Sequence, residues 1–293
     1  MRRYVRTIVA AVLAIAAGVS VGVRVDAQDA AVFRANADAV TVGVSVQRGG
    51  RPVPDLAQAD FELTDNGVAQ TIGALSYEKL PIDLTVLLDV STSVNGRVLD
   101  QLRRAVNDLR KNLRPQDRLR LVAVNMRIQR LVDFDAPPAA IDAAFANLTS
   151  GGASAVLDAL AVSLASAAPP DRRQFAVIFT DGKDSISINT PDMLLDTARR
   201  TTAAISVVLA TPLRRPADRI YTDLANETGG QVVSLLPGET FGDTLQRALD
   251  QFRSSYVLTY TPTGVERTGA HALAVHVKRG GVDVRARKGY EVR

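Results

Sequence analysis

Residues 84–93 read Leu-Thr-Val-Leu-Leu-Asp-Val-Ser-Thr-Ser and carry the clearest indication of the fold. Its first half is a nearly continuous apolar run, which is typical of a strand buried on both faces of a sheet. Its second half supplies one carboxylate and three hydroxyls. The change from apolar to polar predicts the carboxyl end of a central strand, which is where ligands bind in open α/β sheets.

Strand and helix patterns alternate from this stretch to residue 260. Apolar residues at three- and four-residue spacing predict an amphipathic helix between Val98 and Leu113. Further strands are predicted at 118–124, 128–134, 175–180, 205–209, 232–236 and 256–260, and further helices at 139–148, 154–168, 191–202, 218–228 and 241–253. We therefore predict an α/β fold with a doubly wound, mostly parallel sheet and helices on both faces.

The segments that flank this region have strand patterns instead. Residues 39–46 alternate valine with other residues, and Asp65-Asn66-Gly67 predicts a hairpin turn between strands at 61–64 and 71–75. Two more strands, at 272–277 and 282–286, are expected to fold back beside the first ones. The predicted domains are thus an N-terminal β unit (28–80), an α/β domain (81–260) and a C-terminal β extension (261–293).

The N-terminus has the pattern of an export signal. Three arginines within the first six residues precede an apolar run over 8–23, and Val25-Asp26-Ala27 places small residues at a cleavage site. This run of 16 residues is shorter than the roughly 20 that a spanning helix needs. We expect a signal peptide over 1–27, cleavage after Ala27, and a secreted or periplasmic protein without stable membrane insertion; a retained N-terminal anchor is the alternative.

Composition narrows the function classes. Loss of residues 1–27 removes four arginines and one aspartate, which lowers the formal charge from +4 to +1, so no nucleic-acid partner is expected. Aromatic residues make up 5% of the chain and tryptophan is absent, which disfavours stacking platforms. The chain has no cysteine, and this excludes disulfides, thiolate catalysis and cysteine-ligated zinc.

Hard oxygen donors occur at three junctions of the α/β pattern. Asp89, Ser91 and Ser93 follow the first strand, Ser154 ends the segment Ser-Gly-Gly-Ala-Ser, and Asp181 lies in Thr-Asp-Gly after the strand at 175–180. Two carboxylates and three hydroxyls suit Mg²⁺, with Ca²⁺ or Mn²⁺ as substitutes. Because so few ligands are anionic, the bound ion would accept one more anionic oxygen, such as a partner's Asp or Glu.

These residues resemble the metal-ion-dependent adhesion site of von Willebrand factor A domains. The family's Asp-x-Ser-x-Ser falls on Asp89, Ser91 and Ser93, its threonine on Ser154, and its second aspartate on Asp181. The resemblance covers about residues 84–260, and the flanking β segments are similar to a bacterial subgroup of exported proteins related to von Willebrand factor A. It implies metal-dependent protein binding, as in adhesion or scaffolding.

Three positions depart from the family pattern, and one of them is Val94, where the family often has methionine. Ser154 replaces threonine, which keeps the hydroxyl but loses the β-branch that restricts χ1. Thr92 stands where the family usually has glycine, and it would be strained if that loop required a positive φ. Asp184 has two interpretations, either as a group that assists the metal through water or as ordinary loop polarity.

A binding module, not an enzyme, is the leading hypothesis. The rivals are a metal-dependent hydrolase and a structural module without a working metal site. A hydrolase would need a general base near the ion, and no histidine or spare glutamate is placed for that role. The only histidines, His271 and His276, are five residues apart on a predicted strand and are expected to point to opposite faces.

Overall fold

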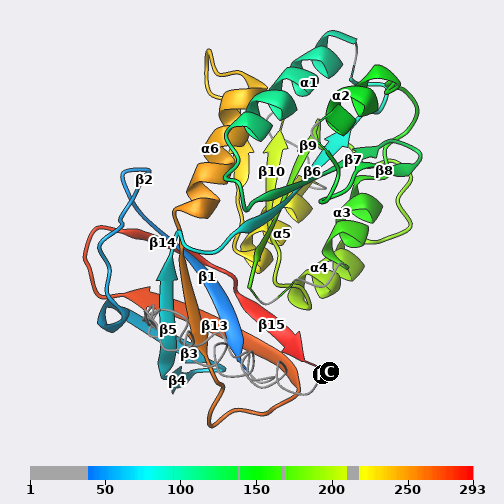
Figure 1. The fold of residues 1–293 in the computed structure, drawn as a ribbon. Helices are drawn as coiled ribbons and strands as arrows, with labels where there is room; N and C mark the ends of the chain where they lie inside the picture. Colours follow the sequence, from blue (N-terminus) through cyan, green and yellow to red (C-terminus); the bar gives the residue numbers. More distant parts are fainter. Residues whose placement is uncertain are drawn as a thin grey trace, which may run out of the picture. The chain divides into compact units, whose positions relative to one another are not determined.

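The computed structural model describes residues 39–94, 96–137, 139–165, 169, 171–209 and 218–292. These residues form one six-stranded α/β sheet with its helices and two smaller antiparallel sheets (Figure 1). The predicted signal peptide, residues 1–27, lies outside the described residues. Among the described residues, no helix combines the length and apolar character needed to cross a membrane.

The six-stranded sheet is doubly wound, as predicted. Its strand order is β11-β10-β9-β6-β7-β8, and all neighbours are parallel except β8, which runs antiparallel to β7. The strands are β6 (Ile82–Asp89), β7 (Arg118–Val124), β8 (Ile128–Val132), β9 (Arg173–Thr180), β10 (Ala204–Leu209) and β11 (Val232–Ser234). Every residue of β6 is buried, which explains its unbroken apolar pattern.

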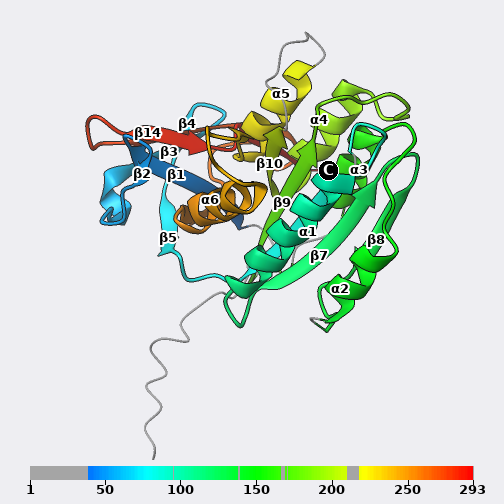
Figure 2. The same cartoon turned by 90° about the horizontal axis from the view of Figure 1, so that it is seen from above.

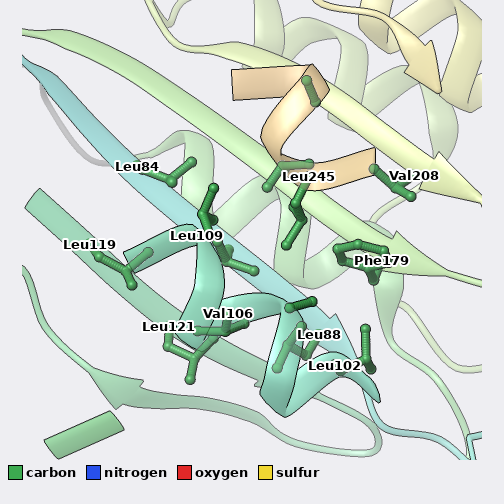
Figure 3. Close-up of a cluster of buried hydrophobic side chains, with 14 of the residues drawn as sticks. Leu84, Leu88, Leu102, Val106, Leu109, Leu119, Leu121, Phe179, Val208 and Leu245 are labelled. Carbon is green, nitrogen blue, oxygen red and sulfur yellow. The ribbon is translucent and has the colours of Figure 1, made fainter. Parts of the chain in front are cut away.

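Helices cover both faces of this sheet (Figure 2). On one face lie α1 (Gly96–Lys111), α2 (Ala139–Ala146) and α6 (Phe241–Arg253), and on the other lie α3 (Val156–Leu164), α4 (Pro191–Arg199) and α5 (Arg219–Thr228). Figure 3 shows the first core, in which Val106 and Leu109 of α1 pack with Leu245 of α6 against Leu88 of β6. Both faces of β6 are therefore covered by apolar side chains.

The remaining strands form two antiparallel sheets that share one apolar core. The first has the order β14-β1-β12-β5, with β2 paired to β1, and contains β1 (Val40–Arg48), β2 (Arg51–Pro52), β5 (Ile72–Tyr77), β12 (Tyr256–Tyr260) and β14 (Asp283–Ala286). The second has the order β15-β13-β3-β4 and contains β3 (Phe61–Asp65), β4 (Val68–Gln70), β13 (Gly269–Val277) and β15 (Gly289–Val292). As expected, the C-terminal strands fold back on the N-terminal ones.

Two sequence-based details of the β region differ in the structure. The Asn66-Gly67 turn has the expected positive φ angles, 47° and 80°, but it joins β3 to the short β4. The strand predicted at 71–75 is β5, and it pairs with β12 in the other sheet. Strand β12 ends the range predicted for the α/β domain, yet it pairs with β1 and β5, two strands of the antiparallel sheet.

The α/β region is thus inserted between two paired strands. The chain leaves β5, builds the α/β sheet, and returns as β12, where Tyr256 pairs with Tyr77. Glu78 follows β5 with a φ of 54°, its carboxylate accepts a hydrogen bond from Ser254, and its carbonyl accepts one from Arg114. These contacts hold the two ends of the inserted region together.

Asp83, near the start of β6, is a buried carboxylate with two arginine partners. It is 1% exposed, and it accepts hydrogen bonds from Arg118, at 2.6 Å and 2.9 Å, and from Arg172. Burial alone would raise the pKa of Asp83, but the hydrogen bonds from Arg118 and Arg172 outweigh burial and hold the pKa below its ordinary value. The charged carboxylate therefore stabilises the fold.

We expect Asp83→Asn to lower the free energy of unfolding at pH 7 by about 1–3 kcal/mol, because two guanidinium groups lose their anion. The folded pKa lies below the unfolded pKa, so this stabilisation is present above the unfolded value of about 3.9 and is lost as pH falls further through the folded pKa. Urea unfolding at pH 7 and at pH 3 or lower should show the difference between wild type and variant shrinking with acid. Asp196→Asn, which removes an exposed pair with Arg199, is the control, and an equal effect of both substitutions would contradict the prediction.

Candidate metal centre

The candidate site lies at the carboxyl ends of β6 and β9. The strand after β6 in the chain, β7, lies on one side of β6, whereas β9 lies on the other. The strand order therefore reverses here, and the loops that follow β6 and β9 diverge to opposite faces of the sheet. Asp89 is the last residue of β6, and Asp181 directly follows β9.

Asp89 is held in one orientation by both of its oxygens. It is 1% exposed; Oδ1 accepts a hydrogen bond from the Ser91 amide at 3.0 Å and Oδ2 accepts one from the Thr180 hydroxyl at 2.8 Å. The hydroxyl oxygens of Ser91 and Ser93 lie 3.2 Å apart. Three of the five predicted ligands thus belong to one tight turn. Its single carboxylate, Asp89, is hydrogen-bonded to Thr180 at the end of β9.

Thr92 links this turn to the loop that precedes α3. Its amide and its hydroxyl both donate to the carbonyl of Gly152, at 3.0 Å and 2.9 Å, and the Gly151 amide donates to the carbonyl of Val90 at 2.8 Å. The loop does not require a positive φ at Thr92, because the described non-glycine residues with positive φ are Asn66 and Glu78. Gly151 and Gly152 adopt the positive φ angles instead, 148° and 81°.

Ser154 combines deep burial with an unused hydroxyl. The residue is 3% exposed, and its Oγ has no hydrogen-bond partner among the described residues. Its backbone is fixed, since the amide donates to the Ser185 hydroxyl at 3.0 Å and the carbonyl accepts from the Ser185 amide at 2.9 Å. The helix predicted from residue 154 begins only at Val156, so Ser154 belongs to the loop.

The loop after Asp181 supplies the N-terminal cap that α3 itself lacks. Asp184 Oδ1 accepts hydrogen bonds from the Leu157 amide at 3.2 Å and from the Ser187 hydroxyl at 2.6 Å. Asp158 in turn accepts from the amides of Ile188 and Asn189, at 3.0 Å and 2.8 Å. Burial would raise the pKa of Asp158, but these amide hydrogen bonds outweigh burial and lower it. Asp184 therefore positions the Ser154 loop through hydrogen bonds within the protein.

Asp181 forms an ion pair with Lys183 of the same loop. Its Oδ1 accepts from the Lys183 amide at 3.0 Å, and Lys183 Nζ lies 3.3 Å from Oδ2. The lysine side chain is 67% exposed, whereas the aspartate side chain is 14% exposed. A metal ion at Asp181 would compete with this solvated ammonium group.

The donor set fits a hard cation that relies on hydroxyl oxygens. Among the described residues, no three side chains of histidine, cysteine, aspartate or glutamate gather closely enough to share a metal. A metal at this edge would thus need the serine hydroxyls as well as the two carboxylates. The unused, buried Ser154 oxygen meets that requirement. Hydrogen bonds join the three segments that carry the five side chains, while the ligand role of each side chain stays a prediction.

Sequence reasoning overlooked the residues that position these side chains. Thr180 lies in the same Thr-Asp-Gly motif as Asp181, but its part, orienting Asp89, depends on the pairing of β6 with β9. Ser185 and Ser187 give no recognisable motif, although alternating serines after Asp184 are typical of capping loops.

Part of the chain matches a known protein family. Residues 84–183 match the family model described as von Willebrand factor type A domain. This region is a von Willebrand factor A-like domain. All five predicted ligands fall within the matched residues of the A-like domain. No curated protein matches the chain.

The chain also matches solved structures at low sequence identity. A von Willebrand factor type A protein from Catenulispora acidiphila is 13% identical with a TM-score of 0.46, and the match covers 87% of this chain and 75% of that one. The SpRpn10 VWA domain is 19% identical with a TM-score of 0.44, covering 57% of this chain and 95% of that one. Proximal thread matrix protein 1 from the mussel byssus, with a zinc-occupied MIDAS motif, is 14% identical with a TM-score of 0.49, covering 64% and 50%.

Both histidines lie on β13, outside the A-like domain. His271 is buried, its Nδ1 lies 2.9 Å from Asp65 Oδ1, and its ring stacks on Tyr290 at 4.4 Å between centroids. His276 is exposed, so the two side chains point to opposite faces, as predicted. His271 thus has a packing role in the β core.

Ser154→Ala and Thr92→Ala separate an unused hydroxyl from a bonded one. In EDTA, we expect Ser154→Ala to leave the free energy of unfolding unchanged or to raise it by up to about 1 kcal/mol, because an unpaired buried polar atom is removed. Thr92→Ala should lower it by about 0.5–1.5 kcal/mol through loss of the bond to Gly152. Urea unfolding measures both values. Equal losses would mean that the Ser154 hydroxyl has a partner within the protein.

Proposed function

We propose that the A-like domain is a protein-binding module that holds a divalent cation through Asp89, Ser91, Ser93, Ser154 and Asp181. The single observation that carries this proposal is the buried Ser154 hydroxyl without a partner, in a loop bonded to the Asp89 turn. A buried polar atom is normally satisfied, and an exception calls for an explanation such as an ion. A cation bound there supplies the missing electrostatic partner and attracts a carboxylate of the binding partner.

Magnesium is the expected cation, with calcium or manganese as substitutes. Carboxylate and hydroxyl oxygens are hard ligands, and zinc sites in proteins more often use histidine and cysteine, which the site lacks. Two of the five side chains are anionic, so their charge balances that of a divalent ion and leaves no excess negative charge at the site. A further carboxylate, from an Asp or Glu of the partner, would therefore meet no net repulsion there.

Exposed apolar side chains at the same edge support a protein partner. Met126, Ile186, Ile188 and Met193 are 64%, 45%, 86% and 51% exposed. The Met126 side chain lies against Gly152, and the Ile186 amide donates to the Ser154 carbonyl. Apolar groups beside a polar site are typical of protein interaction surfaces. These four residues would contact the partner around its carboxylate.

The alternatives meet specific difficulties. A metal-dependent hydrolase needs a general base beside the ion, yet Asp184 and Asp158 accept hydrogen bonds from backbone amides, and His271 and His276 lie on β13. We therefore propose a binding role, not catalysis. A structural module without a working metal site is the remaining alternative, and the titrations below test it.

The proposed location is outside the cytoplasm. The signal pattern over residues 1–27 supports export to the periplasm or beyond, with no stable membrane insertion after cleavage. The formal charge of +1 that remains without these residues disfavours a nucleic-acid partner. A fully cysteine-free chain is compatible with an oxidising compartment, because it presents no thiol.

Metal binding is tested by isothermal titration of the purified protein with Mg²⁺, Mn²⁺, Ca²⁺ and Zn²⁺. We expect wild type to bind Mg²⁺ or Mn²⁺, and Asp181→Ala and Ser154→Ala to lose most of the binding heat. Metal at 100 times its Kd should stabilise wild type by about 2.7 kcal/mol. Asp196→Ala, on the exposed face of α4, is the matched control. Equal binding heats for wild type and Asp181→Ala would contradict the proposed metal site.

Lys183→Ala should have the opposite effect on the same titration. The exposed pair of Lys183 with Asp181 contributes at most about 1 kcal/mol, so its removal should tighten metal binding by up to about fivefold. Weaker metal binding by Lys183→Ala would contradict competition at Asp181.

Metal-dependent hydrolysis of an ester or phosphate panel, abolished by Asp89→Ala, would favour the enzyme instead.

A further inference from the structure

A polar crevice lies beside the Asp89 turn, outside the proposed metal ligands. Its volume is about 170 Å³, and its polar lining consists of Asn125, Gln129, Asn147 and Thr149. Val90 and Ala123, both buried, form part of its apolar lining. The crevice therefore lies between the β7–β8 edge of the sheet and the segment that connects α2 to α3.

The polar groups of the crevice are neutral and mostly unused. The side chains of Gln129, Asn147 and Thr149 are exposed and make no hydrogen bond to another described residue. Asn125 is fixed in place, because its Oδ1 accepts from the Arg127 amide at 2.9 Å and its carbonyl accepts from the Ala155 amide at 3.1 Å. Three carboxamides and one hydroxyl both donate and accept hydrogen bonds, and no charged side chain lines the crevice.

The crevice and the metal site share one wall. Val90 directly follows Asp89, and its carbonyl accepts the Gly151 amide at 2.8 Å. The segment from Asn147 to Thr149 lines the crevice and continues through Gly151 to Ser154. A ligand group in the crevice therefore lies beside the two chain segments that carry Asp89 and Ser154.

We infer that this crevice binds a neutral amide of the partner segment whose carboxylate reaches the metal, so the inference rests on the proposed function. An amide matches the crevice because a carboxamide can exchange a donor and an acceptor with it at once. An anion would meet no cation there, and a sugar ring would meet no aromatic side chain. The amide belongs either to a peptide link or to an Asn or Gln side chain of the segment that carries the acidic residue.

The test uses displayed linear peptides with a fixed central Asp and randomised flanks, selected on wild-type protein in Mg²⁺. Selected peptides are synthesised, and their affinities are measured in Mg²⁺ and in EDTA. We expect the double variant Gln129→Ala/Asn147→Ala to bind them at least about tenfold more weakly, as loss of two amide groups that hydrogen-bond the peptide predicts. Its own Mg²⁺ affinity should equal that of wild type. Gln116→Ala, an exposed amide on the α1–β7 connection, is the matched control.

Two modified peptides identify the source of the amide. Replacing a flanking Asn or Gln by Ala removes a side-chain amide, whereas N-methylation of a flanking peptide link removes a backbone donor. Each change should weaken binding to wild type but not to the crevice double variant. Peptides that need Mg²⁺ yet bind the double variant as tightly as wild type would overturn the inference and leave the proposed function standing. An absence of selected peptides, or binding that persists in EDTA, would contradict the proposed function and the inference together.

Discussion

The parallel pairing of β6 with β9 is the constraint on which the site depends. This pairing sets Leu88 opposite Phe179, so that Asp89 and Thr180 leave the sheet together and share a hydrogen bond of 2.8 Å. Burial of β6 between two apolar helix layers keeps the register, because a slip would move its carboxylate into the core or away from Thr180. Sheet packing thus orients a polar side chain at the sheet's edge.

Much of this arrangement could be predicted from periodicity and from junction residues. The apolar run 84–88 predicted a central strand, Thr190 caps α4 through its hydroxyl, and Gly229 ends α5 with a φ of 74°. The chain positions of Asp89 and Asp181 at strand ends followed from the same patterns. Local signals sufficed there because each feature depends on a few neighbouring residues.

The rest depended on contacts between segments that are distant in the sequence. Thr92 looked unsuited to a loop that prefers glycine, yet it bonds to Gly152, 60 residues away, and Gly151 and Gly152 take the unusual φ angles. Asp184 could be interpreted as a metal assistant or as loop polarity, and its partner proves to be the N-terminus of α3. Strand β12 has the apolar pattern of an α/β strand, but its partners are β1 and β5. Periodicity does not encode which sheet a buried strand joins.

The same contacts explain why Ser154 can remain unsatisfied. A serine in a flexible loop would rotate or move to reach water, but here Ser185 bonds both the amide and the carbonyl of Ser154, while Asp184 and Ser187 hold the amides that follow. An unpaired buried hydroxyl is destabilising, so the surrounding hydrogen bonds must offset its cost. Such preorganisation reduces the loss of conformational entropy when a ligand binds. The rigid edge with its unsatisfied Ser154 hydroxyl therefore suits the ion-mediated binding that we propose.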